Sequence, residues 1–230
     1  MRVVFVVAAL LACLLLAGCE TPAIKQAKLE SDLLEAAWDG NVELVRTLLD
    51  QGVNLNTHDE YQATPLMYSA YRSHLAVVRL LLAHHADVNA ADNNQVTPLM
   101  QAARNGTPRI VNLLLQAQAE VEARDASQHT ALIYAASSKN APCVKLLIAA
   151  GADLNVRNQV GMTPLFVAVQ RGEREMVRML LVGGADPDVP TNDGQTALQV
   201  AEQGGYAEIV TLLRIFGAKQ TRPGVTSWGF

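Results

Sequence analysis

Histidine and cysteine are the side chains of this sequence that could ligate a metal ion or act as nucleophiles. His84 and His85 lie just before Asp87, and His58 lies on the loop that comes one step earlier. Imidazoles grouped with carboxylates form the donor set that zinc and copper take. We nevertheless predict no metal site, because His85 stands where a helix should end and His74 occupies a turn. His84 and His85 remain the candidates if a metal is bound.

Catalytic chemistry lacks a supporting pattern in this chain. Cys143 falls on the apolar stripe of a predicted helix, so we expect a buried thiol rather than a nucleophile. The sequence has no glycine-rich phosphate loop after a strand pattern and no serine in a nucleophile elbow. We therefore predict that the protein is not an enzyme, and we keep a metal-handling or enzymatic role of the loop histidines as an alternative.

Cys19 is the cysteine with a distinctive context. Met1-Arg2 precedes an uncharged apolar run over 3–16, which has the length of a signal-peptide core and is short of the ~20 residues of a membrane span. Leu16-Ala17-Gly18-Cys19 then resembles the lipobox of bacterial lipoproteins. The resemblance implies cleavage before Cys19, whose sulfur carries diacylglycerol. An ordinary secretory signal or an uncleaved anchor is the alternative.

This resemblance divides the start of the chain and suggests its location. Residues 1–18 would be a lipoprotein signal peptide, and 19–30 would form a lipidated N-terminus and tether that spans at most about 35 Å. Acyl chains on Cys19 would anchor the protein to the bacterial envelope, with no other cofactor. Glu20 stands where an aspartate commonly signals retention at the inner membrane. We expect the outer membrane, facing the periplasm, with the inner membrane or the cell surface as alternatives.

The remainder of the sequence repeats with a fixed period of 33 residues. The positions that open each unit are Thr64-Pro65-Leu66, Thr97-Pro98-Leu99, Thr130-Ala131-Leu132, Thr163-Pro164-Leu165 and Thr196-Ala197-Leu198, and 31–37 fits the same pattern one period earlier. Threonine is a good helix N-cap and proline is tolerated in the first turn, so each motif starts a helix. A turn glycine, a second apolar helix and a terminal glycine such as Gly151 complete the unit.

At these residues the chain resembles the ankyrin repeat family. The resemblance implies an all-α solenoid of stacked helix-turn-helix units joined by hairpin-like loops, with about six repeats over 31–218 and a tail over 219–230. The first and last repeats would act as caps. The histidine of the family hallmark is missing from every unit, so its usual hydrogen bond should be replaced by apolar packing. Its place is taken by Leu34, Met67, Met100, Ile133, Phe166 and Gln199.

Composition bounds the partners. Lys and Arg total 18 against 22 Asp and Glu, which argues against a nucleic-acid footprint. If Cys13 is removed with the signal peptide and Cys19 is acylated, only Cys143 keeps a free thiol. No internal disulfide can then form. We expect a monomer that binds another protein and contacts the membrane through its lipid.

Partners of ankyrin-like stacks usually contact the loop tips and the exposed ends of the first helices. Tryptophan, tyrosine and arginine, the residues enriched in binding hot spots, gather at such positions in the first three repeats. The candidate partner-binding residues are Trp38, Tyr61, Tyr71, Arg72, Arg104 and Asn105. The alternative is that Trp38 packs against 20–30 and caps the stack.

The sequence thus favours a membrane-anchored, non-catalytic interaction module of the periplasm or cell envelope. A sharper alternative is an inhibitor or immunity protein that occludes a toxin or enzyme in that compartment. The chain carries no feature that names its partner.

Overall fold

The computed structural model describes residues 21–219. The predicted signal peptide, Cys19 and nearly all of the predicted tail lie outside the described residues. Within 21–219 the chain forms twelve α-helices and no strand, which confirms the all-α prediction. These residues belong to two compact units, one ending at Asn93 and the other beginning at Asn94. The extent of the repeat domain, 31–218, stays a prediction.

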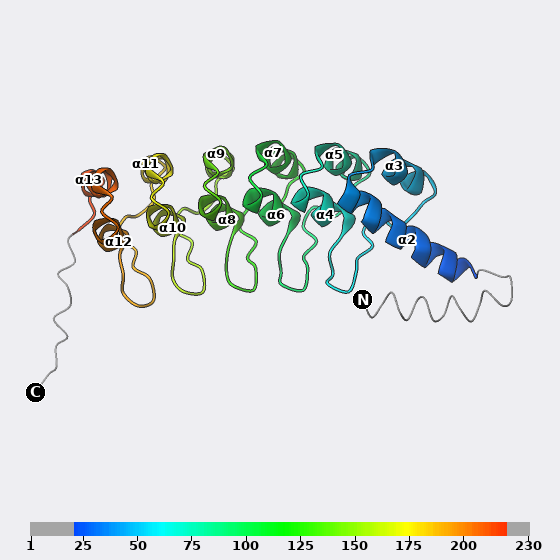
Figure 1. The fold of residues 1–230 in the computed structure, drawn as a ribbon, viewed down its shortest axis with the longest axis horizontal. Helices are drawn as coiled ribbons and strands as arrows, with labels where there is room; N and C mark the ends of the chain where they lie inside the picture. The colour runs from blue at the N-terminus through cyan, green and yellow to red at the C-terminus, as the bar shows by residue number, and fades with distance from the viewer. Residues whose placement is uncertain (1–20, 220–230) are drawn as a thin grey trace, which may run out of the picture. The chain divides into compact units, whose positions relative to one another are not determined.

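The first unit holds two helical pairs (Figure 1). They are α2 (Pro22–Asp39) with α3 (Val42–Asp50), and α4 (Pro65–Tyr71) with α5 (Leu75–Ala83). The first helices of the two pairs, α2 and α4, pack side by side, and α3 packs against α5 in a second layer. A loop that leads from α3 to α4 projects away from the second layer.

The second unit continues the same pattern with four pairs. Its helices are α6 (Pro98–Arg104), α7 (Pro108–Gln116), α8 (Ala131–Ser137), α9 (Ala141–Ala149), α10 (Pro164–Gln170), α11 (Arg174–Val182), α12 (Ala197–Gln203) and α13 (Ala207–Ile215). Even-numbered helices form one layer and odd-numbered helices the other, and each helix packs on its counterpart in the next pair.

Threonine side chains start most of the short first helices as the sequence predicts. The Oγ1 atoms of Thr64, Thr97, Thr163 and Thr196 accept hydrogen bonds from the backbone N–H three residues later. Thr130 makes no such cap, and its hydroxyl is buried without a partner. An N-cap bond of this kind is worth about 1 kcal/mol, so α8 starts with less local support than its neighbours.

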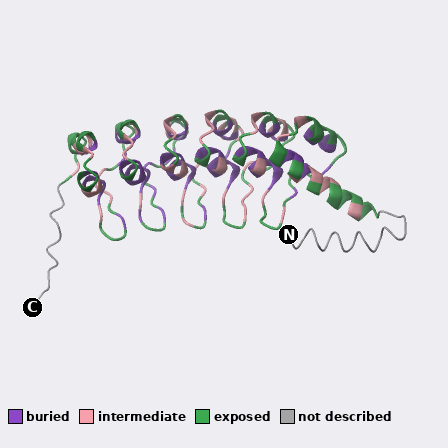
Figure 2. Cartoon of the chain, viewed as in Figure 1, coloured by how far each residue is buried: buried purple, intermediate pink, exposed green. Residues whose placement is uncertain are grey.

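Apolar packing replaces the missing hallmark histidine in four repeats. Met67, Met100, Ile133 and Phe166 are buried, as predicted. Figure 2 shows buried residues along the first helices of both units. Two of the replacements also accept a hydrogen bond from the N-cap backbone N–H and close a capping box: Met67 Sδ from Thr64 at 3.4 Å, and Gln199 from Thr196 at 3.0 Å. Small buried residues such as Ala36 and Ala102 let neighbouring first helices approach closely within their units.

The described part of the predicted tether, 19–30, is helical. Helix α2 starts at Pro22, nine residues before the repeat pattern, and runs unbroken to Asp39. After its N-terminal proline the segment has neither glycine nor proline, and its Ala, Lys, Gln, Leu and Glu residues favour a helix. Its first half is largely exposed. Among residues 21–219, no helix combines the length and apolar character required to cross a bilayer.

Left-handed backbone recurs at fixed points of the repeat. The ends of the second helices have positive φ at Gly52, His85, Gln118, Gly151, Gly184 and Gly217. The turns within pairs do so at Ser73 and Lys139 as well as at glycines. Sequence reasoning missed a third series at the loop tips, where Gln62, Gln95 and Gln128 adopt the conformation that Gly161 and Gly194 adopt later. Non-glycine residues are strained there.

Backbone hydrogen bonds join successive loop tips within each unit. The N–H of Asn93 donates to the Tyr61 carbonyl in the first unit, and in the second unit Ala126 donates to Asn94 and Gln159 to Ser127. A side-chain series runs beside it, in which Asp186 N–H donates to Asn155 Oδ1 at 2.8 Å. These bonds hold each loop on its neighbour without any strand.

We predict that His85→Gly and Gln118→Gly each raise the free energy of unfolding by about 1 kcal/mol, because glycine relieves the positive φ. Urea unfolding followed by circular dichroism measures the change. His84→Gly is the matched control: His84 has a negative φ of −95°, so glycine there should lower stability. A destabilised His85→Gly would contradict the strain argument.

Candidate functional site

Trp38, Tyr71 and Arg72 come together in the first unit. Trp38 lies at the end of α2, and its ring stacks on Tyr71 with centroids 5.9 Å apart and planes 20° apart. The Arg72 guanidinium lies over the Trp38 ring at 4.9 Å from its centroid, and Tyr68 contacts the same ring edge-on at 5.3 Å. The structure therefore builds an aromatic-arginine cluster, defined by Trp38, Tyr68, Tyr71 and Arg72.

The alternative role of Trp38, packing against 20–30, is wrong for the residues described. The helical segment 22–30 runs away from Trp38 because both belong to α2. The indole packs instead on α4 and its C-cap Arg72. Trp38 keeps 39% of its surface exposed and Tyr71 keeps 41%, so the cluster both joins two helices and faces solvent.

Hydrogen bonds at Trp38 and Tyr68 hold this cluster in place. The Trp38 carbonyl accepts a hydrogen bond from His74 Nε2 at 2.9 Å, which ties the end of α2 to the start of α5. Gly40 is required there, since a Cβ would meet the His74 ring at 2.5 Å and the backbone has φ of +74°. Tyr68 donates its hydroxyl hydrogen to Asp59, and burial, followed by this bond and the carboxylate charge, raises the pKa of Tyr68 far above its usual value.

Tyr61 lies apart from the cluster on the loop before α4. Its side chain is 63% exposed, while its backbone carbonyl accepts from Asn93. Asp59 shapes this loop, because its Oδ1 accepts from the N–H groups of Tyr61 and Ala63. Tyr61 therefore lies at a loop tip, where the sequence places it.

Arg104 and Asn105 belong to the second unit, at the end of α6. The Arg104 guanidinium lies 5.9 Å from the centroid of the Tyr134 ring on α8, and the Arg104 carbonyl accepts from Ser138 Oγ. Asn105 is the exposed C-cap of α6. Sequence reasoning did not single out Arg171, whose Nη2 donates to Ser137 Oγ at 3.3 Å on the same helix α8. The available signal was its place 99 residues, or three 33-residue periods, after Arg72.

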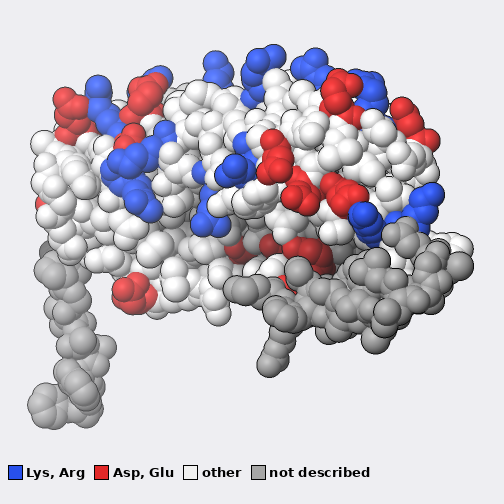
Figure 3. All heavy atoms as spheres, turned by 45° about the vertical axis from the view of Figure 1, so that its right-hand side comes forward, with Lys and Arg blue, Asp and Glu red and all other residues white. Residues whose placement is uncertain are grey.

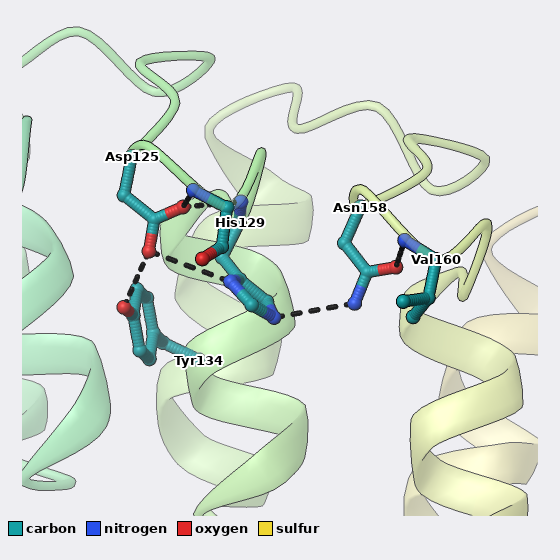
Figure 4. A network of polar contacts seen from close by, with 6 residues as sticks. Asp125, His129, Tyr134, Asn158 and Val160 are labelled. Atoms are coloured by element: carbon teal, nitrogen blue, oxygen red, sulfur yellow. Dashed lines mark hydrogen bonds and ion pairs between the residues drawn. The ribbon is translucent and has the colours of Figure 1, made fainter.

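The second unit also contains an aspartate-histidine pair (Figure 4). Asp125 Oδ1 accepts from the backbone N–H groups of Ser127 and His129, and Oδ2 accepts from the Tyr134 hydroxyl at 2.6 Å. His129 Nδ1 lies 3.4 Å from Oδ2, outside hydrogen-bond geometry but within ion-pair range. Its Nε2 faces the Asn158 side-chain nitrogen at 3.2 Å.

Asn158 determines which nitrogen of His129 carries the proton. Asn158 Oδ1 accepts from the backbone N–H groups of Val160 and Met162, so its Nδ2 is the donor toward His129. Nε2 of the imidazole must then accept, and the neutral ring carries its proton on Nδ1, facing Asp125. Because Nε2 is engaged by Asn158, this pair links two successive loops instead of presenting a base.

The remaining chemistry-bearing residues are dispersed. His84 and His85 lie exposed at the end of α5, and His58 Nδ1 bonds to the Asp59 carbonyl. Residues 21–219 contain no group of three or more His, Cys, Asp or Glu side chains that could hold a metal ion, so the cluster weighed for these histidines is not assembled. Cys143 is fully buried, as predicted, and burial raises the pKa of its thiol to about 11.

The chain belongs to the ankyrin repeat family. The family model for ankyrin repeats (3 copies) matches residues 33–125, 90–158 and 132–223. A solved ankyrin repeat domain from Acinetobacter baumannii AYE is 34% identical, covers 81% of this chain and 98% of its own, and superposes with a TM-score of 0.77. A comparison with curated proteins finds no match. Ankyrin repeats suggest a protein–protein interaction module, and the family is generally non-catalytic.

We predict that Asp125→Ala lowers the free energy of unfolding by about 3 kcal/mol, because it orphans a hydroxyl and two partly buried N–H groups. Asp125→Asn, which keeps an oxygen for the two N–H groups, should cost only about 1 kcal/mol. Urea unfolding curves measure both. Equal losses for the two variants would show that the backbone bonds are not what Asp125 contributes.

Proposed function

We propose that this protein is a non-catalytic module that holds another protein at the bacterial cell envelope, anchored by lipid on Cys19. The observation that carries the binding role is the aromatic-arginine cluster of the first unit. Trp38 and Tyr71 leave about two fifths of their surfaces exposed although both have neighbours to pack against. Rigid aromatic rings and arginine supply contact area at low entropic cost, which is typical of hot spots.

The way the cluster is held supports the same proposal. Its rings are fixed by stacking, by an edge-on contact and by the guanidinium of Arg72, so a partner would meet a preformed surface. Preorganised side chains lose little conformational entropy on binding. Tyr61 adds a second exposed ring on the neighbouring loop of the same unit.

The envelope location is proposed from the sequence. Leu16-Ala17-Gly18-Cys19 behind a short apolar run supports cleavage and acylation at Cys19, and Glu20 favours the outer membrane. Helix α2 fits a role as connector, because its exposed first half adds about 13 Å of helix before the first repeat. A bound partner would then be held close to the bilayer surface.

The binding proposal predicts that Tyr71→Ala/Arg72→Ala reduces partner capture at least about tenfold in crosslinked envelopes, since each residue would be a hot spot. Arg46→Ala/Arg79→Ala is the matched control, because it removes exposed side chains from α3 and α5 in the same unit. Tyr71 is preferred to Trp38 because losing the indole would also loosen α2 from α4. Unreduced capture by a folded Tyr71→Ala/Arg72→Ala chain would refute the proposed surface.

The anchoring proposal predicts an N-terminus at Cys19 that carries the added mass of acyl chains, which mass spectrometry of the purified protein measures. Cys19→Ser should abolish the acylation and shift the protein from the membrane fraction to the soluble fraction. Finding Met1 intact on the unaltered chain would overturn the anchor while leaving the binding role open.

A further inference from the structure

Two arginine side chains converge on one helix of the second unit. Arg104 comes from the end of α6 and Arg171 is the C-cap of α10, and α8 packs between these helices. Arg104 reaches the Tyr134 ring and Arg171 reaches Ser137 Oγ. Tyr134 and Ser137 are three residues apart on α8 and thus neighbours on its surface, about 5–6 Å apart at Cβ. The Arg104–Arg171 face is defined by these four residues.

The two guanidinium groups have no carboxylate partner in the described chain. Arg104 and Arg171 are exposed, and neither forms an ion pair with a residue of 21–219. Carboxylates close to the face are engaged elsewhere. Asp125 accepts from Tyr134 and two backbone N–H groups, and Glu173 pairs with Lys139 at 2.8 Å. The face therefore presents two guanidinium groups outside any ion pair of 21–219, with the Asp125 carboxylate behind the Tyr134 hydroxyl as the acidic group next to them.

The surroundings restrict what this face would bind. Lys139 also donates to the Arg171 carbonyl, so a third cation lies at the same edge with its charge already paired (3.5 Å). In the view of Figure 3, basic and acidic side chains are interspersed over the visible face. Arginine forks match the two oxygens of a carboxylate. The half-buried Tyr134 ring lies beside Arg104, and Ser137 on the same helix holds Arg171.

We propose that the Arg104–Arg171 face binds an acidic segment of the protein partner, with neighbouring Asp or Glu carboxylates on the two guanidinium groups. This inference rests on the proposed function, since a bound protein partner would supply the carboxylates that match the charge of the two arginines. It adds a chemical class for the partner and a second contact that is carried by the second unit alone. Free phosphate could engage the same guanidinium groups, and the test separates it.

The probe is a fluorescein-labelled peptide of eight glutamates, titrated with the full chain in detergent and followed by fluorescence anisotropy. Arg104→Gln/Arg171→Gln should weaken binding of this peptide by at least about tenfold, since it removes both charged contacts. Arg109→Gln/Lys145→Gln on α7 and α9 is the control, because it removes the same charge from exposed positions of the same unit. The control should change the affinity less than about twofold.

Three results would overturn the proposal. The first is that the glutamate peptide does not bind the unaltered chain, and the second is that the two double variants weaken its binding equally. The third is that inorganic phosphate displaces the peptide at a concentration below that of the peptide carboxylates. The first two would leave the aromatic-arginine cluster untouched, because that cluster lies in the first unit and is tested by partner capture. Failure of the acidic-segment proposal and failure of the binding module are therefore distinguishable.

Discussion

Each helical pair of this chain can bury its apolar residues only against the pair before or after it. A first helix of seven residues such as α8 exposes too much apolar surface to be stable alone, yet Leu132, Ile133 and Ala135 are almost fully buried between neighbours. The loops obey the same constraint, since their tips are held by hydrogen bonds to the preceding tip. Side chains at the ends of the first helices lie outside this core, so packing does not restrict them to apolar types.

This division of labour explains why both candidate surfaces occur at equivalent positions of the repeat. Trp38, Tyr71 and Arg72 lie at the ends of α2 and α4, and Arg104 and Arg171 lie at the ends of α6 and α10. The repeat fixes the backbone there but leaves the side chain free to vary. In the first unit aromatic rings fill the position, and in the second unit guanidinium groups reach toward a shared helix. One scaffold thereby presents two candidate surfaces of different chemistry.

Much of the fold could be predicted from the 33-residue period, because threonine caps, turn glycines and apolar stripes each mark a place in the unit. Two features of the fold were missed. The first half of helix α2 begins before the pattern, so only its helix-forming residues indicate it. The positive φ of Gln62, Gln95 and Gln128 could have been inferred from the glycines at the same position of the later repeats, Gly161 and Gly194. Trp38, Tyr71 and Arg72 were singled out from residue type and position, whereas Tyr68, which completes their cluster, was not. The convergence of Arg104 and Arg171 was not predicted, because it depends on the conformations of long side chains.

Helix α2 extends as one continuous helix from the predicted tether into the first repeat. Its buried residues are Leu33, Ala36 and Ala37, so the turns before them are held by backbone hydrogen bonds and not by packing. A helix turns about 100° per residue. Inserting one alanine in the exposed turns would therefore rotate whatever precedes Pro22 around the helix axis by that angle while leaving every repeat contact intact. The number of residues in the exposed half of α2 therefore sets the direction in which the first repeat faces. Adding or removing a residue in that half rotates the repeat more than it displaces it.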